Sequence, residues 1–508
     1  MGASTKFIAR IALLATSAGA FSLPPMALPL GASSSNNGIR MAADATAGAS
    51  ALESGKLQRV AVVGGGPAGA LMALYLSRSG GFEVDLFETS AESKIAGPTS
   101  RSWNVILFDR ACDALEGGGF DLQREVGDLV ITTAGSVRHN AKKKVGGGPA
   151  VGTKSICRGD LAKALLNKAD RSPNINVHFD CSFSTMDVNK GVATYERGNG
   201  ETFESAFDML VGADGVNSRV REALQDHSPG FTVREREGIK TYKVFEIPIM
   251  GMEGAEESWK SYIHSSNSKK GSVVASPRSD GVASAALMLP RGEKVTFETL
   301  MTTTQDVRDY FGSNHPGLYG PEGPDEDVAR NLLEQRPKLS RTIYCSQLNF
   351  RSVVLIGDAA HAMQASLGQG VNCALEDCQV LAQLLAAETR KTGAVKADRF
   401  PEVLEVYNKH RLGDVHAACE LSEIGSALGI RKTLTAQLTL TLLLNKTLGR
   451  LFPKIFRPPS LFAINSKDEG YGAVLRGFER EAAVAKGVGF ASVALIFGGV
   501  ARRVILRI

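Results

Sequence analysis

The stretch from Arg59 to Glu88 constrains the fold of this 508-residue chain more than any other. It reads RVAVVGGGPAGALMALYLSRSGGFEVDLFE, and it opens with a β-branched apolar run at 60–63 that is typical of a buried strand. Residues 70–78 have helical character, and 84–87 form a second apolar run. The pattern predicts a strand, a tight turn, a helix and a parallel second strand.

Three glycines lie in the predicted turn, in the spacing G-x-G-x-x-G: Gly64, Gly66 and Gly69. Such glycines allow a tight turn and let the backbone approach a pyrophosphate at the start of a helix. Glu88 ends the second strand, where an acid accepts hydrogen bonds from a ribose hydroxyl. The segment therefore predicts a dinucleotide site, and on its own it leaves NAD and FAD open.

A second segment, LVGADGVNSRVREAL, places Asp214 and Gly215 after a short apolar strand, with Ser218 and Arg221 behind them. Taken alone it is a strand, a turn and a helix with a serine cap, which is a frequent structural device.

A third segment, LIGDAAHAMQASLGQGVNCALEDC at 355–378, is rich in groups that could bind a metal or a phosphate. It repeats the strand–turn–helix form, with a strand at 353–356 and a long helix predicted at 371–388. Cys373 and Cys378 are five residues apart and no second cysteine pair follows, so no metal site is predicted.

The three segments in this order resemble the FAD-dependent aromatic hydroxylases, the single-component flavoprotein monooxygenases. The resemblance covers the chain from Arg59 to its end. It implies bound FAD, NADPH or NADH as co-substrate, and O2 and a small ring compound as the other reactants. A flavin C4a-hydroperoxide would hydroxylate the ring.

The resemblance carries cofactor roles onto the matching positions of this chain. Asp358 would bind a ribitol hydroxyl, and the backbone at 368–372 would lie at the pyrimidine edge of the flavin. His361, Glu376 and Asp377 are interpreted as structural, and no catalytic base is identified. The predicted cofactor-binding residues are Gly64, Gly66, Gly69, Glu88, Arg158, Asp214, Asp358, Gly368, Gly370, Val371 and Asn372.

Within this class, residues 101–120, 151–166 and the C-terminal region resemble the kynurenine 3-monooxygenases. That group binds the amino-acid end of its substrate with an arginine, two tyrosines and an asparagine. Here Val151 replaces one tyrosine, Leu434 replaces the asparagine, and 125–133 contains no arginine, while Tyr471 is retained. Leaving a buried carboxylate without partners costs several kcal/mol, so a more apolar substrate is expected.

Ala365 occupies a position that is usually proline in this family, and Ser366-Leu367 replace a frequent Phe-Phe. This loop would shape the site of oxygen chemistry. Two alternatives therefore stay open: an isoprenoid or carotenoid epoxidase or reductase of the same fold, and a flavin-binding protein without turnover, which Ala365 favours.

The two ends of the chain differ from its body. Residues 1–25 combine Lys6 and Arg10 with a short apolar run, and a leader rich in small residues follows to about 58. With Phe21 after the small residues, this resembles a bipartite plastid leader, with a mitochondrial or secretory-pathway membrane as the alternative. The uncharged run 487–501 has basic flanks and predicts membrane contact, with a buried core helix as the alternative.

Charge and cysteine content narrow the function further. The net charge of +5 comes from the two ends, so the body shows no basic footprint for nucleic acid. Seven cysteines without a CxxC pair indicate reduced thiols.

The expected fold class is α/β, with a Rossmann-type FAD domain, an inserted, mainly antiparallel substrate sheet and a C-terminal helical segment. The apolar stretch at 433–452 is expected to be a core helix. The predicted boundaries are 1–58 for the leader, 59–240 and 341–412 for the FAD domain, 241–340 for the sheet, 413–485 for the helical segment and 486–508 for the tail.

Overall fold

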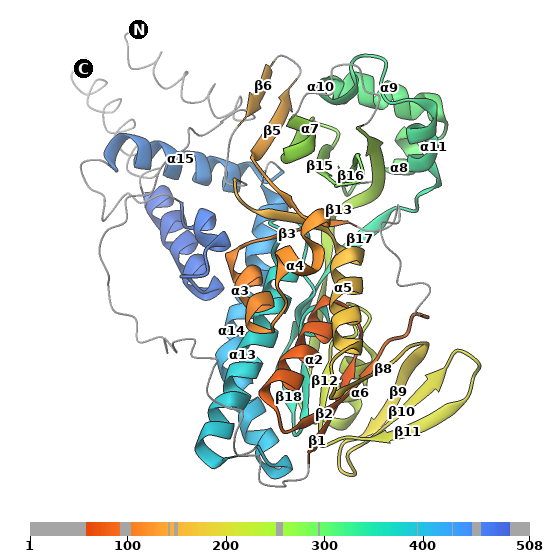
Figure 1. Ribbon diagram of the computed structural model, residues 1–508. Helices are drawn as coiled ribbons and strands as arrows, with labels where there is room; N and C mark the ends of the chain where they lie inside the picture. Colours follow the sequence, from red (N-terminus) through yellow and green to blue (C-terminus); the bar gives the residue numbers. More distant parts are fainter. Residues whose placement is uncertain are drawn as a thin grey trace, which may run out of the picture.

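The computed structural model describes residues 57–91, 103–140, 143–146, 151–249, 258–292, 295–393, 395–428, 430–449 and 459–487. Two packed units, each with its own hydrophobic core, make up this part of the chain (Figure 1). The predicted leader and tail lie outside the described residues, apart from 57–58 and 486–487.

The lower unit in Figure 1 is built on a six-stranded sheet in the order β18-β19-β12-β1-β2-β8. All of its neighbouring strands pair in parallel except β18 and β19. Its central strands are apolar runs because both faces of the sheet are covered. The strands are β1 (Gln58–Val63), β2 (Phe82–Phe87), β8 (Ile175–His178), β12 (Met209–Gly212), β18 (Asn349–Phe350) and β19 (Val353–Leu355).

Helices lie on one side of this sheet, where α2 (Pro67–Ser79) packs between α5 (Arg158–Asp170) and α13 (Gln369–Thr392). Helix α14 (Phe400–Ala427) packs against α13 in turn. Phe87 of the main sheet stacks on Tyr195 of a three-stranded meander, with ring centroids 3.7 Å apart. The meander consists of β9 (Cys181–Asp187), β10 (Val192–Arg197) and β11 (Thr202–Ala206).

Shorter elements complete the lower unit around the glycine turn and the start of α13. A small antiparallel sheet has the order β3-β7-β4. These elements are β3 (Asn104–Leu107), α3 (Asp109–Gly117), α4 (Leu122–Val126), β4 (Ile131–Thr132), β7 (Lys154–Cys157), α6 (Arg219–His227) and α12 (Asp358–His361).

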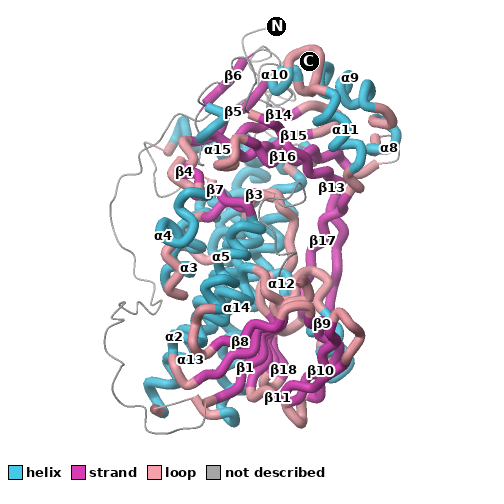
Figure 2. Tube along the Cα trace, turned by 45° about the vertical axis from the view of Figure 1, so that its right-hand side comes forward, coloured by secondary structure: helices cyan, strands magenta, loops and turns pink. Residues whose placement is uncertain are grey.

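The upper unit is a seven-stranded sheet in the order β17-β13-β16-β15-β14-β5-β6. It is antiparallel except for the β14–β5 pair. Strands β13 and β17 run on from this sheet towards the lower unit and connect the two (Figure 2). The strands are β5 (Gly135–Asn140), β6 (Lys143–Gly146), β13 (Val233–Pro248), β14 (Tyr262–Asn267), β15 (Ser272–Pro277), β16 (Val282–Pro290) and β17 (Lys338–Cys345).

One face of the upper sheet is covered by helices and carries the second core, which includes Phe245, Leu287 and Phe311. The adjacent helices are α7 (Ser258–Ser261), α8 (Phe297–Leu300), α9 (Thr304–Asn314), α10 (Pro316–Tyr319) and α11 (Glu326–Glu334). Because strand residues alternate between faces, the neighbours of the buried set point to the opposite face, where Val244 and Ala286 are buried and Tyr242 and Met288 are half-buried.

The observed elements cross several of the predicted boundaries. Strand β13 begins at Val233 and β17 ends at Cys345, so the sheet extends beyond 241–340 at both ends. Strands β5 and β6 also join it, although they come from the middle of the first predicted FAD segment. Helix α14 is continuous across the boundary at 412/413. Composition does not reveal these features, because they depend on strand pairing and helix continuation.

Helix α15 (Lys432–Leu448) is formed as its apolar spacing predicts, but it lies at the margin of the core, against which Leu434 packs. Each of its described side chains is half-buried or exposed, and Leu443 is 40% exposed. Among the described residues, no helix combines the length and apolar character needed to cross a membrane.

Candidate flavin site

The glycine turn between β1 and α2 is too tight for side chains at two of its three glycines. A Cβ on Gly69 would lie 1.9 Å from the carbonyl oxygen of Gly64. Gly64 has φ +107°, and a Cβ there would lie 2.4 Å from the oxygen of Ala213. Gly66, by contrast, faces open space and precedes α2 without a side-chain cap. The amides at the start of α2 are thus accessible to a phosphate, as FAD binding requires.

Glu88 lies directly after β2, beside this turn. Its Oε2 accepts the amide of Gly65 at 2.7 Å, and its Oε1 accepts the amide of Ser90 at 2.8 Å. Each carboxylate oxygen has a second lone pair that can accept a ribose hydroxyl. The position and the chemistry of Glu88 fit the adenosine ribose of FAD.

Asp214 is placed against the same turn, because a Cβ on Gly64 would lie 2.9 Å from its Cα. Its carboxylate oxygens accept hydrogen bonds from its own loop: Oδ1 from the Ser218 hydroxyl at 2.5 Å, and Oδ2 from the amide of Arg219 at 2.7 Å. Burial raises the pKa of Asp214, and these hydrogen bonds oppose that rise. Ser218 in turn caps α6. The structure therefore gives Asp214 a loop-forming role, and its contact with FAD stays a prediction.

Arg221 connects the second sequence motif to the third. Its buried guanidinium donates to the carbonyl of Ala359 and to that of Val216, both at 2.8 Å. The Asp214 loop and the start of α12 are thereby held in a fixed relation across 138 residues of chain. The sequence shows Arg221 as part of the second motif, but it does not show its contact with the third.

Asp358 and the start of α13 come together at the other end of the site. Asp358 is exposed, and its carboxylate has no hydrogen bond within the part of the chain that the structure describes. A Cβ on Gly370 would lie 4.0 Å from Asp358 Oδ1. Gly368 precedes α13 in the left-handed conformation, with φ +67° and no side-chain cap. These uncovered amides and this carboxylate match the donors and acceptor that a flavin and its ribitol need.

The last two residues of the predicted α13 contact differ in their surroundings. Val371 is half-buried, whereas the Asn372 side chain is buried and fully used by the protein. Its Oδ1 accepts the amide of Phe108 at 2.8 Å, and its Nδ2 donates to Ile106 at 2.8 Å. The Asn372 side chain therefore attaches β3 to α13, which leaves only its backbone for a cofactor.

Arg158 begins α5, is exposed, and lies within electrostatic range of Tyr242. Tyr242 comes from β13, and its ring is steeply inclined to that of Trp103, at an interplanar angle of 70° with the centroids 5.5 Å apart. Burial raises the pKa of the Tyr242 hydroxyl, an effect that Arg158 opposes and Asp358 strengthens. Tyr242 is therefore within electrostatic range of two predicted FAD residues. The sequence reasoning missed it, although the alternation of KTYKVF at 240–245 is a usable strand signal.

A buried ion network underlies α13 and confirms the structural interpretation of its acids. Arg411 donates to Asp377 through Nε at 3.0 Å and Nη2 at 2.7 Å. His361 Nε2 lies 2.6 Å from the other oxygen of Asp377. Burial alone would raise the pKa of Asp377, but His361 and Arg411 lower it to about 2. Glu376 accepts from both Arg110 and Arg411, at 2.9 and 3.1 Å.

The same network contains three potential metal donors: His361, Cys373 and Asp377 come within 4.8 Å of one another. Arg411 already supplies positive charge there, since its Nη2 lies 3.5 Å from the Cys373 sulfur and 2.7 Å from Asp377. All seven cysteines of the chain are outside disulfides, as the absence of paired spacings suggested.

The four predicted pocket residues lie in different surroundings. Val151 is on the turn before β7 and is 65% exposed, and Leu434 is half-buried on α15. Ala365 is exposed on the loop between α12 and α13. Tyr471 is fully buried, and its hydroxyl donates to Gln369 at 3.0 Å. The structure therefore brings Tyr471 to the start of α13, next to the loop that carries Ala365.

Comparison with known proteins agrees with this geometry. The family model described as FAD binding domain matches residues 58–420. The chain is 33% identical over 352 residues to a kynurenine 3-monooxygenase of Salinispora arenicola, covering 67% of this chain and 75% of the relative. It is 31% identical over 383 residues to the kynurenine 3-monooxygenase of Sus scrofa, covering 73% and 76%.

Solved structures show the same fold. A 2-methyl-3-hydroxypyridine-5-carboxylic acid oxygenase superposes with a TM-score of 0.59 at 23% identity, covering 73% of this chain and 92% of that one. PqsL of P. aeruginosa superposes with a TM-score of 0.56 at 18% identity, covering 75% and 99%. The chain belongs to the FAD-binding family of aromatic hydroxylases, close to the kynurenine 3-monooxygenases, and is an FAD-dependent monooxygenase.

Proposed function

We propose that this monooxygenase consumes NADPH and O2 to hydroxylate a ring compound other than kynurenine, one more apolar than an amino acid. The observation that carries the proposal is that Tyr471 is already fully engaged by other residues of the protein. Of the four residues that the resemblance assigns to the amino-acid end of kynurenine, it is the one this chain retains. Its hydroxyl is already bonded to Gln369, and its ring is covered by the guanidinium of Arg110 at 4.2 Å.

The other three positions support the same conclusion. Val151 and Leu434 offer no hydrogen bond to a carboxylate or an ammonium group. In the segment 125–133, the carboxylate of Glu125 pairs with Lys168 at 2.5 Å, and no arginine is present. A zwitterionic substrate would find none of these charged or polar partners here, and any of its charges enclosed without a partner would cost several kcal/mol. Kynurenine is therefore expected to be a poor substrate.

The residues of the site divide the work of catalysis. Glu88, the open turn at Gly66, Asp358 and the amides at the start of α13 would hold FAD, and bound FAD supplies the redox chemistry. The chain itself must orient the ring substrate and exclude water. The loop at 364–367 contributes to this enclosure, because Ser366 donates to the carbonyl of Ser422 at 2.5 Å and so closes against α14.

The proposal is tested with the full chain loaded with FAD. NADPH oxidation and O2 uptake are followed while kynurenine and then a panel of phenols and quinols are added, and products are identified by mass. A product heavier by one oxygen atom from a compound of the panel, with kynurenine inert, supports the proposal. Formation of hydroxykynurenine contradicts the proposal that the substrate pocket is altered. Consumption of NADPH with a reduced product and no O2 uptake identifies a reductase.

We also propose that the protein is plastid-targeted and contacts a membrane through its C-terminal tail. The support is in the sequence alone: the bipartite pattern of residues 1–58 and the uncharged run 487–501 between basic residues. A fluorescent fusion of residues 1–58 that fails to enter plastids contradicts the first part. Equal flotation with vesicles of the full chain and of a variant ending at 485 contradicts the second.

A further inference from the structure

Two lysines of β13, on opposite faces of the upper sheet, differ in their hydrogen bonding. Lys243 points to the covered face, where its amine donates to the carbonyls of Leu332 and Leu333 at 3.0 and 3.3 Å. Lys240 is three residues earlier on β13 and therefore points to the opposite face. It is half-buried, and its amine has no hydrogen bond or ion pair within the part of the chain that the structure describes.

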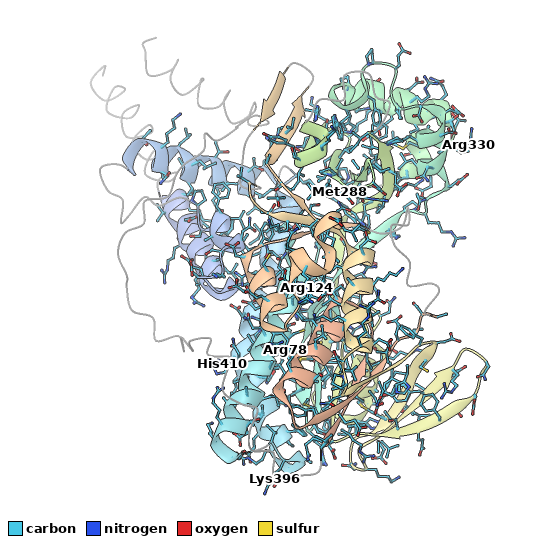
Figure 3. All side chains as sticks on the ribbon, viewed as in Figure 1. Arg78, Arg124, Met288, Arg330, Lys396 and His410 are labelled. Carbon is cyan, nitrogen blue, oxygen red and sulfur yellow. The ribbon has the colours of Figure 1, made fainter. Side chains whose placement is uncertain are left out.

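The face that carries Lys240 also carries Tyr242, which contacts Trp103, and the Trp103 carbonyl accepts the amide of Arg158 at 2.9 Å. Lys240 and Tyr242 alternate on one face of β13, and their partners on β16 are Pro290 and Met288. Tyr242 lies near Arg158 and Asp358, both predicted to contact FAD. Met288, labelled in Figure 3, is half-buried, and it continues this face across the sheet. Lys240 is thus a cation on the sheet side of the site, with apolar neighbours.

The backbone of β13 is irregular at this point. Its pairing with β17 shifts between Glu237 and Thr241, so three residues of β13 stand opposite one residue of β17. Gly238 makes the irregularity possible, because a Cβ there would lie 2.3 Å from the Ser340 hydroxyl. Such bulges re-aim a side chain and are frequent beside active sites. The bulge includes Lys240, whereas its pairing with Pro290 of β16 remains regular.

The cost of burying the Lys240 ammonium group favours binding of an anion beside it. Burial lowers the pKa of Lys240, and no carboxylate of the described residues forms an ion pair with it. Removing an ammonium from water without a partner is costly, and an anion that binds beside it removes that cost. Lys243, with two carbonyl acceptors, shows how the same fold satisfies a lysine that serves structure alone.

We propose that Lys240 binds an anionic oxygen of the ring substrate, a carboxylate or a phenolate, from the sheet side of the flavin site. This rests on the proposed function and specifies its substrate class: an apolar ring with one anionic group, held from β13 and not from the C-terminal helices. The missing arginine, tyrosine and asparagine of the kynurenine group are then replaced by one cation on a different element.

The first measurement is binding without turnover. The oxidised, FAD-loaded full chain is titrated with 4-hydroxybenzoate and anthranilate, with their neutral carboxamides, and with phenol and anisole, while the flavin absorbance is followed. Acids or ionised phenols should bind at least about tenfold more tightly than their neutral counterparts. That preference should disappear in Lys240→Met and return in part in Lys240→Arg. Lys270→Met, which removes the same charge from an exposed hairpin, should keep it.

The second measurement does not depend on bound FAD. Acylation of Lys240 by an amine reagent is followed by peptide mass spectrometry in the apoprotein and the holoprotein, with and without each compound. Protection of Lys240 by the acids or by the ionised phenols, and not by the neutral compounds, supports the assignment. The pattern of protection also separates the carboxylate from the phenolate.

The assignment is overturned if acids and amides bind equally, if Lys240→Met retains FAD yet leaves the preference unchanged, or if no compound binds or protects Lys240. Its failure is distinguishable from failure of the proposed function. Lys240-dependent binding of anions without any oxygenated product would contradict the function alone. Oxygenated neutral products from an enzyme indifferent to Lys240→Met would contradict this assignment alone.

Discussion

Arg411 and Asp377 form a doubly hydrogen-bonded ion pair, at 3.0 and 2.7 Å, between α14 and α13 in the interior of the FAD-binding unit. The other Asp377 oxygen accepts the amide of Gly357 at 2.9 Å, which fixes the turn immediately before Asp358. A residue predicted to touch FAD is therefore positioned by a carboxylate that has no access to solvent.

Replacing Asp377 with Asn should lower the free energy of unfolding by about 3 kcal/mol, because the change removes the fully buried counter-charge that accepts two hydrogen bonds from the Arg411 guanidinium. Chemical denaturation of the full chain measures the effect. Glu405→Gln, which removes a carboxylate from an exposed pair with Lys409 on α14, should change the value by less than about 0.5 kcal/mol. Equal effects of the two substitutions would contradict a stabilising role for the buried pair.

The stability of the protein should fall as the pH is lowered from 6.5 to 4 because of His315. This residue is fully buried, and burial lowers its pKa from 6.5 to about 4. The folded state therefore binds fewer protons than the unfolded state in this window, so the contribution is present above pH 6.5 and is lost on acidification. The loss should be on the order of 3 kcal/mol, and His315→Gln should flatten it. If substitution of the exposed His227 flattens the curve equally, His315 is not the cause.

Two glycines of one turn should give opposite phenotypes on substitution by alanine. Gly66→Ala adds a methyl group in open space at φ −66°, so the protein should fold with unchanged stability and bind FAD at least about tenfold more weakly. Gly69→Ala places its methyl group 1.9 Å from a backbone oxygen, so folding itself should suffer. Flavin fluorescence titration and thermal unfolding separate the two effects. Undiminished FAD affinity in Gly66→Ala would place the pyrophosphate elsewhere.

Tyr471→Phe should lower stability by about 1 to 2 kcal/mol, because it leaves the buried Gln369 oxygen without its donor. The substitution should leave the activity with kynurenine unchanged. Tyr262→Phe is the matched control, since the Tyr262 hydroxyl makes no hydrogen bond within the described residues. A selective rise in the KM for kynurenine in Tyr471→Phe would mean that this hydroxyl does bind the substrate.

The sequence was sufficient for the parts of the fold that repeat a local pattern. The strand, turn and helix from Gln58 to Ser79, the second strand and the long helix α13 lie where periodicity and glycine spacing put them. Glu88 was also predictable, because its role follows from its position at the end of a strand.

Long-range contacts were beyond the same reasoning. The side chain of Asn372 accepts a hydrogen bond from the amide of Phe108, 264 residues away, and no local pattern of α13 reveals that partner. Helix α15 shows a second limit of the sequence. The spacing of its apolar residues predicts the helix, but the burial of those residues depends on which other elements pack against it. Lys240 was missed because its character comes from a strand bulge and from the absence of a counter-charge among its described neighbours.

The pairing of β14 with β5 has a consequence for engineering. Residues 233–345 resemble a cassette that could be transplanted into a related enzyme to move substrate preference with it. Within such a cassette β14 would lose β5, its parallel partner from residues 135–140, and would become an exposed edge with open amides and carbonyls. Edges of that kind recruit other chains and aggregate. A working chimera of this enzyme must therefore carry two separate pieces of the chain, the β5–β6 hairpin together with the cassette.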